Sequence, residues 1–435
     1  MTAVKKTILL LFAAFYQVFA APIIVHAEAL FISPDDAVQK AIDYNLNLKK
    51  LLLDVSSADY QARRLWAEFF PSISATASAG YSGSLFSGSG FEFNDKGTSY
   101  SASLGISLGL NASSVYAIKN IRLAYQSKLL SYEDACNQLE IQVIKNFYSL
   151  IAERENLGVL NETLNLARQQ LEKSQLGFNN GLVSELILTQ SKLALENARY
   201  ELGAARLIFE THMEEFLALL GLSQGTETVL SGKIEISGFD VDAEALIRQY
   251  LPGRPDIVIR RQEIERLENA ERQAALNSRS PSIDLSLGWR SANFAPFSDS
   301  LSGTAKITIP IDSWIPGTRG AQSVRNAGIA IDKARLDLKI AENQAAIQIR
   351  SLAANVRNSW DSVEIARLGL QAAELSYELT EQGFRNGAIE YLKLEDARNN
   401  LTNIRQRLLR SELVGQTAVL DLCAALNINW KELIK

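Results

Sequence analysis

The chain has 435 residues, which is enough for two or three domains of ordinary size. Its 44 Lys and Arg residues stand against 49 Asp and Glu residues, and no basic block stands out, so we expect no nucleic-acid partner. With only two cysteines and two histidines, the sequence excludes a disulfide framework and a His-rich metal site, and we expect no metal and no cofactor.

The cysteines and histidines are expected to have ordinary structural roles. Cys136 and Cys423 lie far apart in helical sequence and should be small buried side chains, with a single bridge between them as the lesser alternative. His26 lies close to the N-terminus, and His212 should be an ordinary helix residue.

Residues 1–27 have the features of a secretory signal peptide. Two lysines precede an apolar run, and Val25-His26-Ala27 places small residues three and one before a cut after Ala27. An uncleaved anchor helix is the alternative, but polar residues and a proline break the run. We therefore expect an exported protein.

A first repeat is predicted over residues 28–220, and it begins with a helix. Ser33 is a favourable N-cap, and Pro34 suits the first helical position. The helix should run to Phe70, because Pro71 cannot continue it.

A strand pair is predicted next, over residues 72–110. SYSASLGISLGL (Ser99 to Leu110) alternates strictly between apolar residues and Ser or Gly, and ISATASAGY (Ile73 to Tyr81) does the same. This period of two is typical of a strand with one apolar and one wet face.

The rest of the first repeat is predicted to be helical. A helix without proline should run from about Ser113 to Phe178, followed by a glycine turn at 177–184 and a helix to about Leu220. A helix of about 66 residues extends roughly 100 Å, which is too long for a compact domain.

Residues 242–435 are predicted to repeat this plan after a linker at 221–241 with weak strand signals. The 26 residues from Gly383 match those from Gly177 at ten positions, at a constant offset of 206. The predicted elements are a helix at 242–278 interrupted near LPGRPD, a strand pair at 282–312, a helix from Thr318 to Gln382, a glycine turn at 383–390 and a helix to Asn429.

The four strands are predicted to contribute to a membrane barrel. Each has about the ten residues that a tilted strand needs to cross a bilayer, and a strand in lipid must have no free edge. Known membrane barrels need at least about eight strands, so closure requires other copies of the chain, and three copies would supply twelve. A soluble sandwich edge packed on helices is the alternative.

The apolar face of each strand is expected to meet outer-membrane lipid. The lipid-facing positions are Ile73, Tyr81, Leu104, Ile106, Leu108, Leu285, Leu287, Trp289, Ile307 and Ile309. Aromatic residues fit girdles at both ends, with Tyr81, Tyr100 and Trp289 near the loops and Phe69, Phe70 and Trp314 near the helices.

Two segments carry a family resemblance. LPGRPDIVIRRQEIERLENAERQAALNSRSPSIDLSLG (Leu251 to Gly288) and GFRNGAIEYLKLEDARNNL (Gly383 to Leu401) resemble TolC-like outer membrane efflux proteins, and the likeness extends over essentially the whole mature chain. It implies a mainly α fold, in which a homotrimer builds a twelve-stranded outer-membrane barrel and a periplasmic tunnel of twelve long helices.

The resemblance also implies function and partners. The chain would be the passive exit duct of a tripartite efflux or type I secretion system, coupled through a periplasmic adaptor protein to an inner-membrane transporter. Drug efflux and protein secretion share such a duct, so both stay open. A P-loop and a His-based triad are missing from the sequence, and we do not expect an enzyme.

In this family the adaptor docks at the two turns at the periplasmic tip. The matching residues are Gly181, Leu182, Val183, Ser184, Gly387, Ala388, Ile389 and Glu390. The alternative is that the two glycines serve chain reversal alone.

Acidic rings often narrow the family's tip just after the second turn. Asp396 matches a commonly acidic position, Lys393 stands where another acid is frequent, and Glu395 stands where an apolar residue is usual. Three copies of Asp396 would attract cations, whereas Lys393 would weaken the effect. The alternative is an exposed helix charge.

A secreted helical scaffold or adhesin stalk without a channel is the remaining alternative function. Heptad-like helices alone would suit it, but it does not explain strands inserted in pairs between helices. Scattered carboxylates are the only feature in favour of an enzyme, and they fit solvated helix faces.

Overall fold

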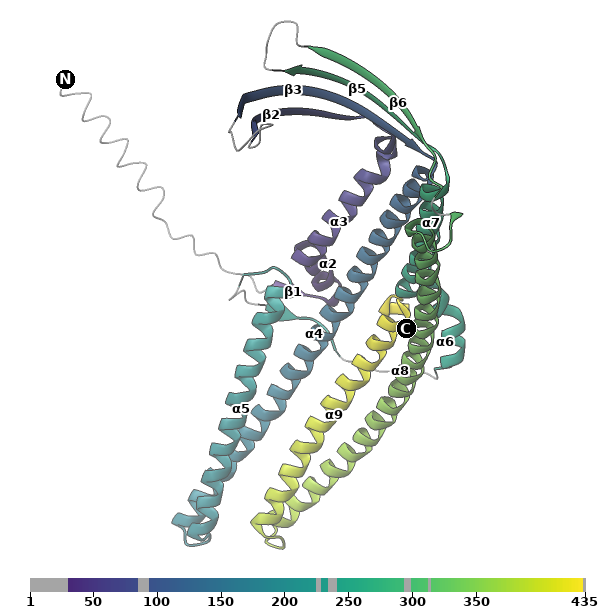
Figure 1. Ribbon diagram of the computed structural model, residues 1–435. Helices are drawn as coiled ribbons and strands as arrows, with labels where there is room; N and C mark the ends of the chain where they lie inside the picture. The colour runs from purple at the N-terminus through teal and green to yellow at the C-terminus, as the bar shows by residue number, and fades with distance from the viewer. Residues whose placement is uncertain are drawn as a thin grey trace, which may run out of the picture. The chain divides into compact units, whose positions relative to one another are not determined.

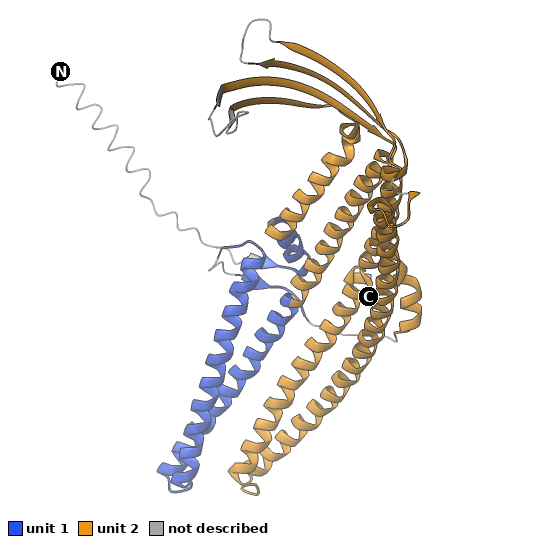
Figure 2. Cartoon of the chain, viewed as in Figure 1, with its two compact units in different colours: residues 1–43, 146–234 blue, residues 44–145, 235–435 orange. Residues whose placement is uncertain are grey.

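A computed structural model describes residues 30–84, 94–223, 228–233, 241–292, 299–311 and 314–432. The predicted signal peptide lies outside these ranges. The chain divides into two compact units, one with residues 1–43 and 146–234 and the other with residues 44–145 and 235–435 (Figure 2). The helix α4 (Ser114–Asn179) begins in the second unit and ends in the first.

The first unit combines the end of α4 with α5 (Glu185–Leu219), α2 (Pro34–Tyr44) and a small parallel sheet of β1 (Leu30–Ile32) and β4 (Thr228–Leu230). Phe147 and Phe216 are almost fully buried, with ring centroids 6.3 Å apart. The Arg154 guanidinium donates to the Leu230 carbonyl at 2.6 Å. His212 contacts Glu153 at 2.8 Å between Nδ1 and Oε1, as a helix residue of α5.

The expected first helix is broken, so the prediction of one helix to Phe70 was wrong. Ser33 caps α2 as predicted, with its Oγ accepting from the Asp36 amide at 3.2 Å. At Asn45 the chain leaves the helix, and the Asn45 side chain accepts from the amides of Asn47 and Leu48. Asparagine is a strong N-cap, so it starts a new helix, α3 (Leu46–Arg63), which a short 3-10 helix, η1 (Leu65–Phe69), follows.

A four-stranded antiparallel sheet in the second unit has the order β2-β3-β5-β6. Its strands are β2 (Ser72–Ser84), β3 (Asn94–Asn111), β5 (Ser282–Ala292) and β6 (Ser300–Thr308). Figure 1 shows it as a curved sheet beside the ends of α3 and α7. β6 ends before the expected Asp312, because Pro310 has no amide hydrogen to donate to the ladder.

The helices of the second unit pack along one another (Figure 1). They include α6 (Ala243–Tyr250), the 3-10 helix η2 (Leu251–Gly253), α7 (Pro255–Arg279), α8 (Arg319–Arg385), α9 (Tyr391–Leu426) and η4 (Trp430–Glu432). Buried small residues such as Ala341, Ala345 and Ala366 let α8 approach its neighbours closely. Arg261–Glu342 and Arg335–Glu268 ion pairs join α7 to α8 at 3.0 and 2.9 Å.

The two longest helices have 66 residues in α4 and 67 in α8, as the sequence predicted. Their partners α5 and α9 have 35 and 36 residues. Within the described residues, none of these helices combines the length and the apolar composition needed to cross a membrane.

Candidate functional site

The turn between α4 and α5 is a sharp reversal built on Gly181. This glycine has a φ of +74°, its amide donates to the Phe178 carbonyl at 3.0 Å, and the Leu182 amide donates to the Gly177 carbonyl at 2.8 Å. This is a Schellman motif, in which a left-handed glycine satisfies the last carbonyls of a helix. Ser184 then caps α5 by accepting from the Ile187 amide at 3.4 Å.

The turn between α8 and α9 has the same geometry. Gly387 has a φ of +72°, its amide donates to Phe384 at 3.0 Å, and the Ala388 amide donates to Gly383 at 2.9 Å. Glu390 occupies the N-cap position of α9 without a side-chain capping bond. The two repeats therefore end in the same backbone motif with different side chains.

The structure divides the predicted docking residues into two groups. Leu182, which is 81% exposed, and Ala388 project outward. Val183 and Ile389 are half-buried and fold back onto their own turns. The outward group therefore offers the more exposed apolar surface to a partner.

Two functional glycines were missed in the sequence. A Cβ on Gly177 would lie 2.5 Å from Cγ2 of Val183, and a Cβ on Gly383 would lie 2.5 Å from Cδ1 of Ile389. Real Cβ atoms do not approach so closely, so each turn needs a second glycine for contact rather than for φ. The repeated pattern G-F-x-N-G-x-[VI] carries this signal.

The three residues of the predicted constriction do not share one environment. Lys393 and Asp396 are exposed and one helical turn apart on α9. Glu395 is largely buried and faces Arg398 at 3.6 Å, and Arg398 is only 8% exposed. The Arg398 Nε atom is buried without a hydrogen-bond partner within the described residues. Glu395 therefore faces a buried arginine that the sequence analysis missed.

The apolar face of the sheet is exposed in the described structure. Of the ten predicted lipid-facing residues, eight are exposed, and Leu108 and Trp289 are half-buried; Ile309, predicted as a strand position, lies one residue beyond the end of β6. The register aligns Ile73 with Ile106 and Ile106 with Leu287 in one cross-strand row. Such a large exposed apolar surface marks an interaction site.

The opposite face of the sheet carries small polar residues. Ser72 and Ser107 form a hydrogen bond of 2.6 Å between their hydroxyls, and Ser78 and Ser101 form one of 2.8 Å. Among strand residues whose side chains are described, this face has three charges, Asp284, Arg290 and Lys306. Asp284 and Lys306 are register partners, so Arg290 is the charge without an opposite partner in its row.

The LPGRPD segment joins three helices of the second unit. Arg254 donates to Asp256 at 2.9 Å and to Gln348 of α8 at 3.1 Å. Burial raises the pKa of the Asp134 carboxyl on α4, and the charge of Asp256 raises it further, against the opposing effects of Arg254 and Gln138. The LPGRPD interruption between α6 and α7 is therefore a segment whose polar side chains contact the neighbouring helix α8.

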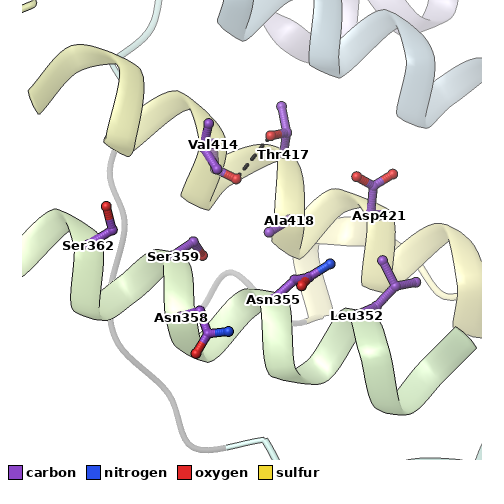
Figure 3. A pocket seen from close by; sticks show the side chains of 9 residues that line it. All are labelled: Leu352, Asn355, Asn358, Ser359, Ser362, Val414, Thr417, Ala418 and Asp421. Carbon is purple, nitrogen blue, oxygen red and sulfur yellow. Dashed lines mark hydrogen bonds between the residues drawn. The ribbon is translucent and has the colours of Figure 1, made fainter. Parts of the chain in front are cut away.

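A groove with both polar and apolar lining residues lies between α8 and α9 (Figure 3). Its volume is about 390 Å³, and its lining combines Asn355, Asn358, Thr417 and Asp421 with apolar residues such as Leu352 and Val414. Asp421 also forms an ion pair with Lys145 of α4. The described residues contain no cluster of three His, Cys, Asp or Glu side chains arranged for a metal. No disulfide joins Cys136 to Cys423; Cys423 is buried as predicted, but Cys136 is only half-buried.

Comparisons with known proteins agree with this architecture. A family model described as "Outer membrane efflux protein" matches residues 37–222 and 246–427. The probable efflux pump outer membrane protein TtgC of Pseudomonas putida is 26% identical over 431 residues, covering 92% of this chain and 84% of its own. The cation efflux system protein CusC of Escherichia coli O157:H7 is 23% identical, covering 91% and 86%.

A solved structure shares the fold. The CmeC outer membrane channel of Campylobacter jejuni superposes with a TM-score of 0.74 at 17% identity, covering 92% of this chain and 88% of its own. The predicted fold class, long helices with four strands of a membrane barrel, is thereby confirmed. Because the family model spans both repeats, the chain belongs to the outer membrane efflux protein family.

Proposed function

We propose that three copies of this chain close a barrel in the outer membrane and form the passive exit duct of a tripartite efflux system. The observation that carries this is the four-stranded sheet with one bare apolar face and two unpaired edge strands, β2 and β6. Within lipid, such edges must be paired, and further copies of the same sheet supply the missing strands. The family itself consists of outer membrane efflux proteins, so the location and the export role come with membership.

The sheet has two different surroundings in this assembly. The face with Ile73, Ile106 and Leu287 contacts lipid, and the face with Ser72, Ser107 and Arg290 lines a water-filled bore. Alternation of this kind is typical of outer-membrane strands. We propose no chemical step for the chain, and the driving force comes from the partner transporter.

The two glycine turns are the proposed docking points for a periplasmic adaptor protein. Their identical backbones, built on Gly181 and Gly387, present Leu182 and Ala388 to water. An exposed leucine at the apex of a rigid turn suits an apolar contact with a partner helix. Around the axis of a trimer, copies of Lys393 and of Asp396 would form two neighbouring rings of opposite charge at the narrow end.

Efflux is favoured over protein secretion as the transport role. The relatives TtgC and CusC are described as efflux components, the second for cations. We therefore propose small molecules or ions as the exported class.

The assembly can be tested in extracted outer membranes. We expect a trimer that survives mild detergent and dissociates on heating. A monomer in the soluble periplasmic fraction would contradict the duct and support a helical scaffold instead.

Docking can be tested with a photo-cross-linker at Leu182 or Ala388, which we expect to capture a periplasmic adaptor. The same cross-linker at Leu301, which is 74% exposed on the apolar strand face, serves as the control and should not capture it. Equal capture at all three positions would argue against docking at the turns.

A further inference from the structure

Exposed aromatic and cationic side chains gather where the helices of the second unit meet the sheet. Trp66, Phe69, Phe70 and Trp314 are between 42% and 68% exposed. Three exposed arginines accompany them, at Arg64, Arg279 and Arg319. We call these seven residues the collar.

The register of the sheet shows which end of the strands lies near the collar. Asn111 pairs with Ser282, and Ser282 pairs with Thr308, so the start of β5 and the ends of β3 and β6 lie together. Arg279 lies three residues before β5, Phe70 two before β2, and Trp314 six after β6. These three residues of the collar therefore lie at the end of the sheet nearest the helices, where the apolar face also ends.

The arginines are held beside aromatic rings. The Arg279 guanidinium lies 5.5 Å from the ring centroid of Trp314, and that of Arg64 lies 4.2 Å from the ring of Tyr60. Trp66 and Phe70 meet edge to face at 5.4 Å. A guanidinium over a ring keeps its charge and its N–H donors free for an anion.

Arg319 lies at a helix position where a positive charge is unfavourable. It is the first residue of α8, where the helix dipole favours an acidic side chain and disfavours a cation. None of the three arginines forms an ion pair with a carboxylate of the described residues. This includes Glu68, the acidic residue of the neighbouring η1. Arg319 is therefore a cation at a helix N-terminus without an internal carboxylate partner, which indicates an external anion, whereas Arg64 and Arg279 lie at the C-terminal ends of α3 and α7.

We propose that the collar binds the headgroup phosphates of phospholipids in the membrane leaflet nearest the helices, with a preference for anionic lipids. This rests on the proposed function, because it requires the apolar face to lie in lipid. Tryptophan and other aromatic residues lie at the level of headgroups, and arginine forms paired hydrogen bonds with phosphate. The continuity of the collar with the apolar face makes a lipid its occupant.

The test compares the full-length trimer in nanodiscs of pure phosphatidylcholine and of phosphatidylcholine mixed with phosphatidylglycerol. Bound lipid is measured by native mass spectrometry, and the melting temperature of the trimer by a heating series. We expect the wild type to retain phosphatidylglycerol and to melt at a higher temperature in the mixed nanodiscs. The R64Q/R279Q/R319Q variant should retain several-fold less and lose the shift.

The control variant R357Q/R407Q/R410Q removes the same charge from exposed helix positions without ion pairs in the described structure. Equal lipid loss in both variants, or none in the collar variant, would overturn the proposal. Stabilisation by inorganic phosphate in detergent to the same extent would show a general anion site instead. Dissociation of the collar variant in detergent alone would show a subunit interface and also overturn it.

The proposed function fails in a different way from the collar. If the wild type does not insert into any nanodisc, the barrel assignment is wrong. If it inserts as a trimer without a preference for phosphatidylglycerol, only the collar proposal is wrong.

Discussion

Gly383 and Ile389 touch so closely across the turn that a methyl group on the glycine would lie 2.5 Å from Cδ1 of the isoleucine. Gly177 and Val183 repeat the contact at the other turn, with the same distance to Cγ2. Each helix pair therefore ends in a turn with two glycines of different purpose, one for a positive φ and one for contact. The duplication indicates that both turns must keep a fixed shape.

The double variant G177A/G383A should disturb both turns. Each added methyl group must displace a packed β-branched side chain, so the hydrogen bonds that close the turns are expected to exchange faster with solvent. Export-dependent resistance should fall. Hydrogen exchange at Leu182 and Ala388 measures the first effect.

The matched control for these glycines is Gly203→Ala on α5, where an added Cβ would meet nothing within 4 Å. This substitution should stabilise the helix by up to about 1 kcal/mol, because alanine has the higher helix propensity. If G177A/G383A behaves like Gly203→Ala, the close contact has no role in the turn.

Ile106→Lys should impair insertion of the barrel, whereas Ser107→Lys should not. A lysine on a lipid-facing strand position near the middle of the bilayer costs about 2–4 kcal/mol. Ser107 lies on the opposite face, with Ser72 and Ser286 as register partners. The amount of heat-sensitive trimer in outer membranes measures the difference. Equal insertion of the two variants would contradict the assignment of the faces.

Local patterns predicted the parts of this fold that depend on neighbouring residues. The alternation from Ser99 to Leu110 gives both faces of β3, and Pro71 marks the end of a helical segment. The break at Asn45 was missed because the amphipathic pattern continues across it, and the N-cap depends on one side chain. The parallel pairing of β1 with β4 joins segments about two hundred residues apart, which no local pattern indicates.

The candidate site likewise combines residues that local sequence patterns identified with residues that they did not. Gly181 and Gly387 were identified because glycine is the usual residue for a positive φ. Gly177 and Gly383 look like tolerated helix glycines until the folded turn places Val183 and Ile389 against them. Arg398 was missed because an arginine in a helix is normally exposed.

Asp134→Asn should raise the melting temperature at neutral pH. The folded-state pKa of Asp134 is raised above its unfolded value, chiefly by burial, so the folded protein holds this proton more tightly. The penalty for the charged form is absent below the unfolded pKa and complete above the folded pKa. The advantage of the variant should therefore shrink as the pH falls through the raised pKa.

The control for this experiment is Asp361→Asn on an exposed position of α8. It removes the same charge and should change the melting temperature little, both at neutral pH and below the raised pKa of Asp134. A pH-independent difference for Asp134→Asn would show that packing, rather than ionisation, is responsible.

Leu182→Glu should abolish adaptor cross-linking and lower resistance while leaving the trimer intact. The side chain is 81% exposed, so a charge there does not disturb the turn, but it would have to be desolvated in an apolar contact. Leu182→Met keeps the apolar character and should behave like the wild type. Unchanged cross-linking by Leu182→Glu would show that this turn does not dock the adaptor.

Arg290→Ser should shift the ion preference of the reconstituted channel toward cations. Arg290 stands in a row with Ser103 and Ser300 on the polar face, so its charge has no opposite partner there. The effect should be clearest in dilute salt, because the Debye length grows from about 10 Å at 0.1 M to about 30 Å at 0.01 M. The reversal potential under a salt gradient measures this ion preference.

The double variant D284S/K306S is the control. It removes two opposite charges of one row and should leave the reversal potential unchanged, since its net charge is the same. A shift as large for the double variant as for Arg290→Ser would place the selective charges elsewhere.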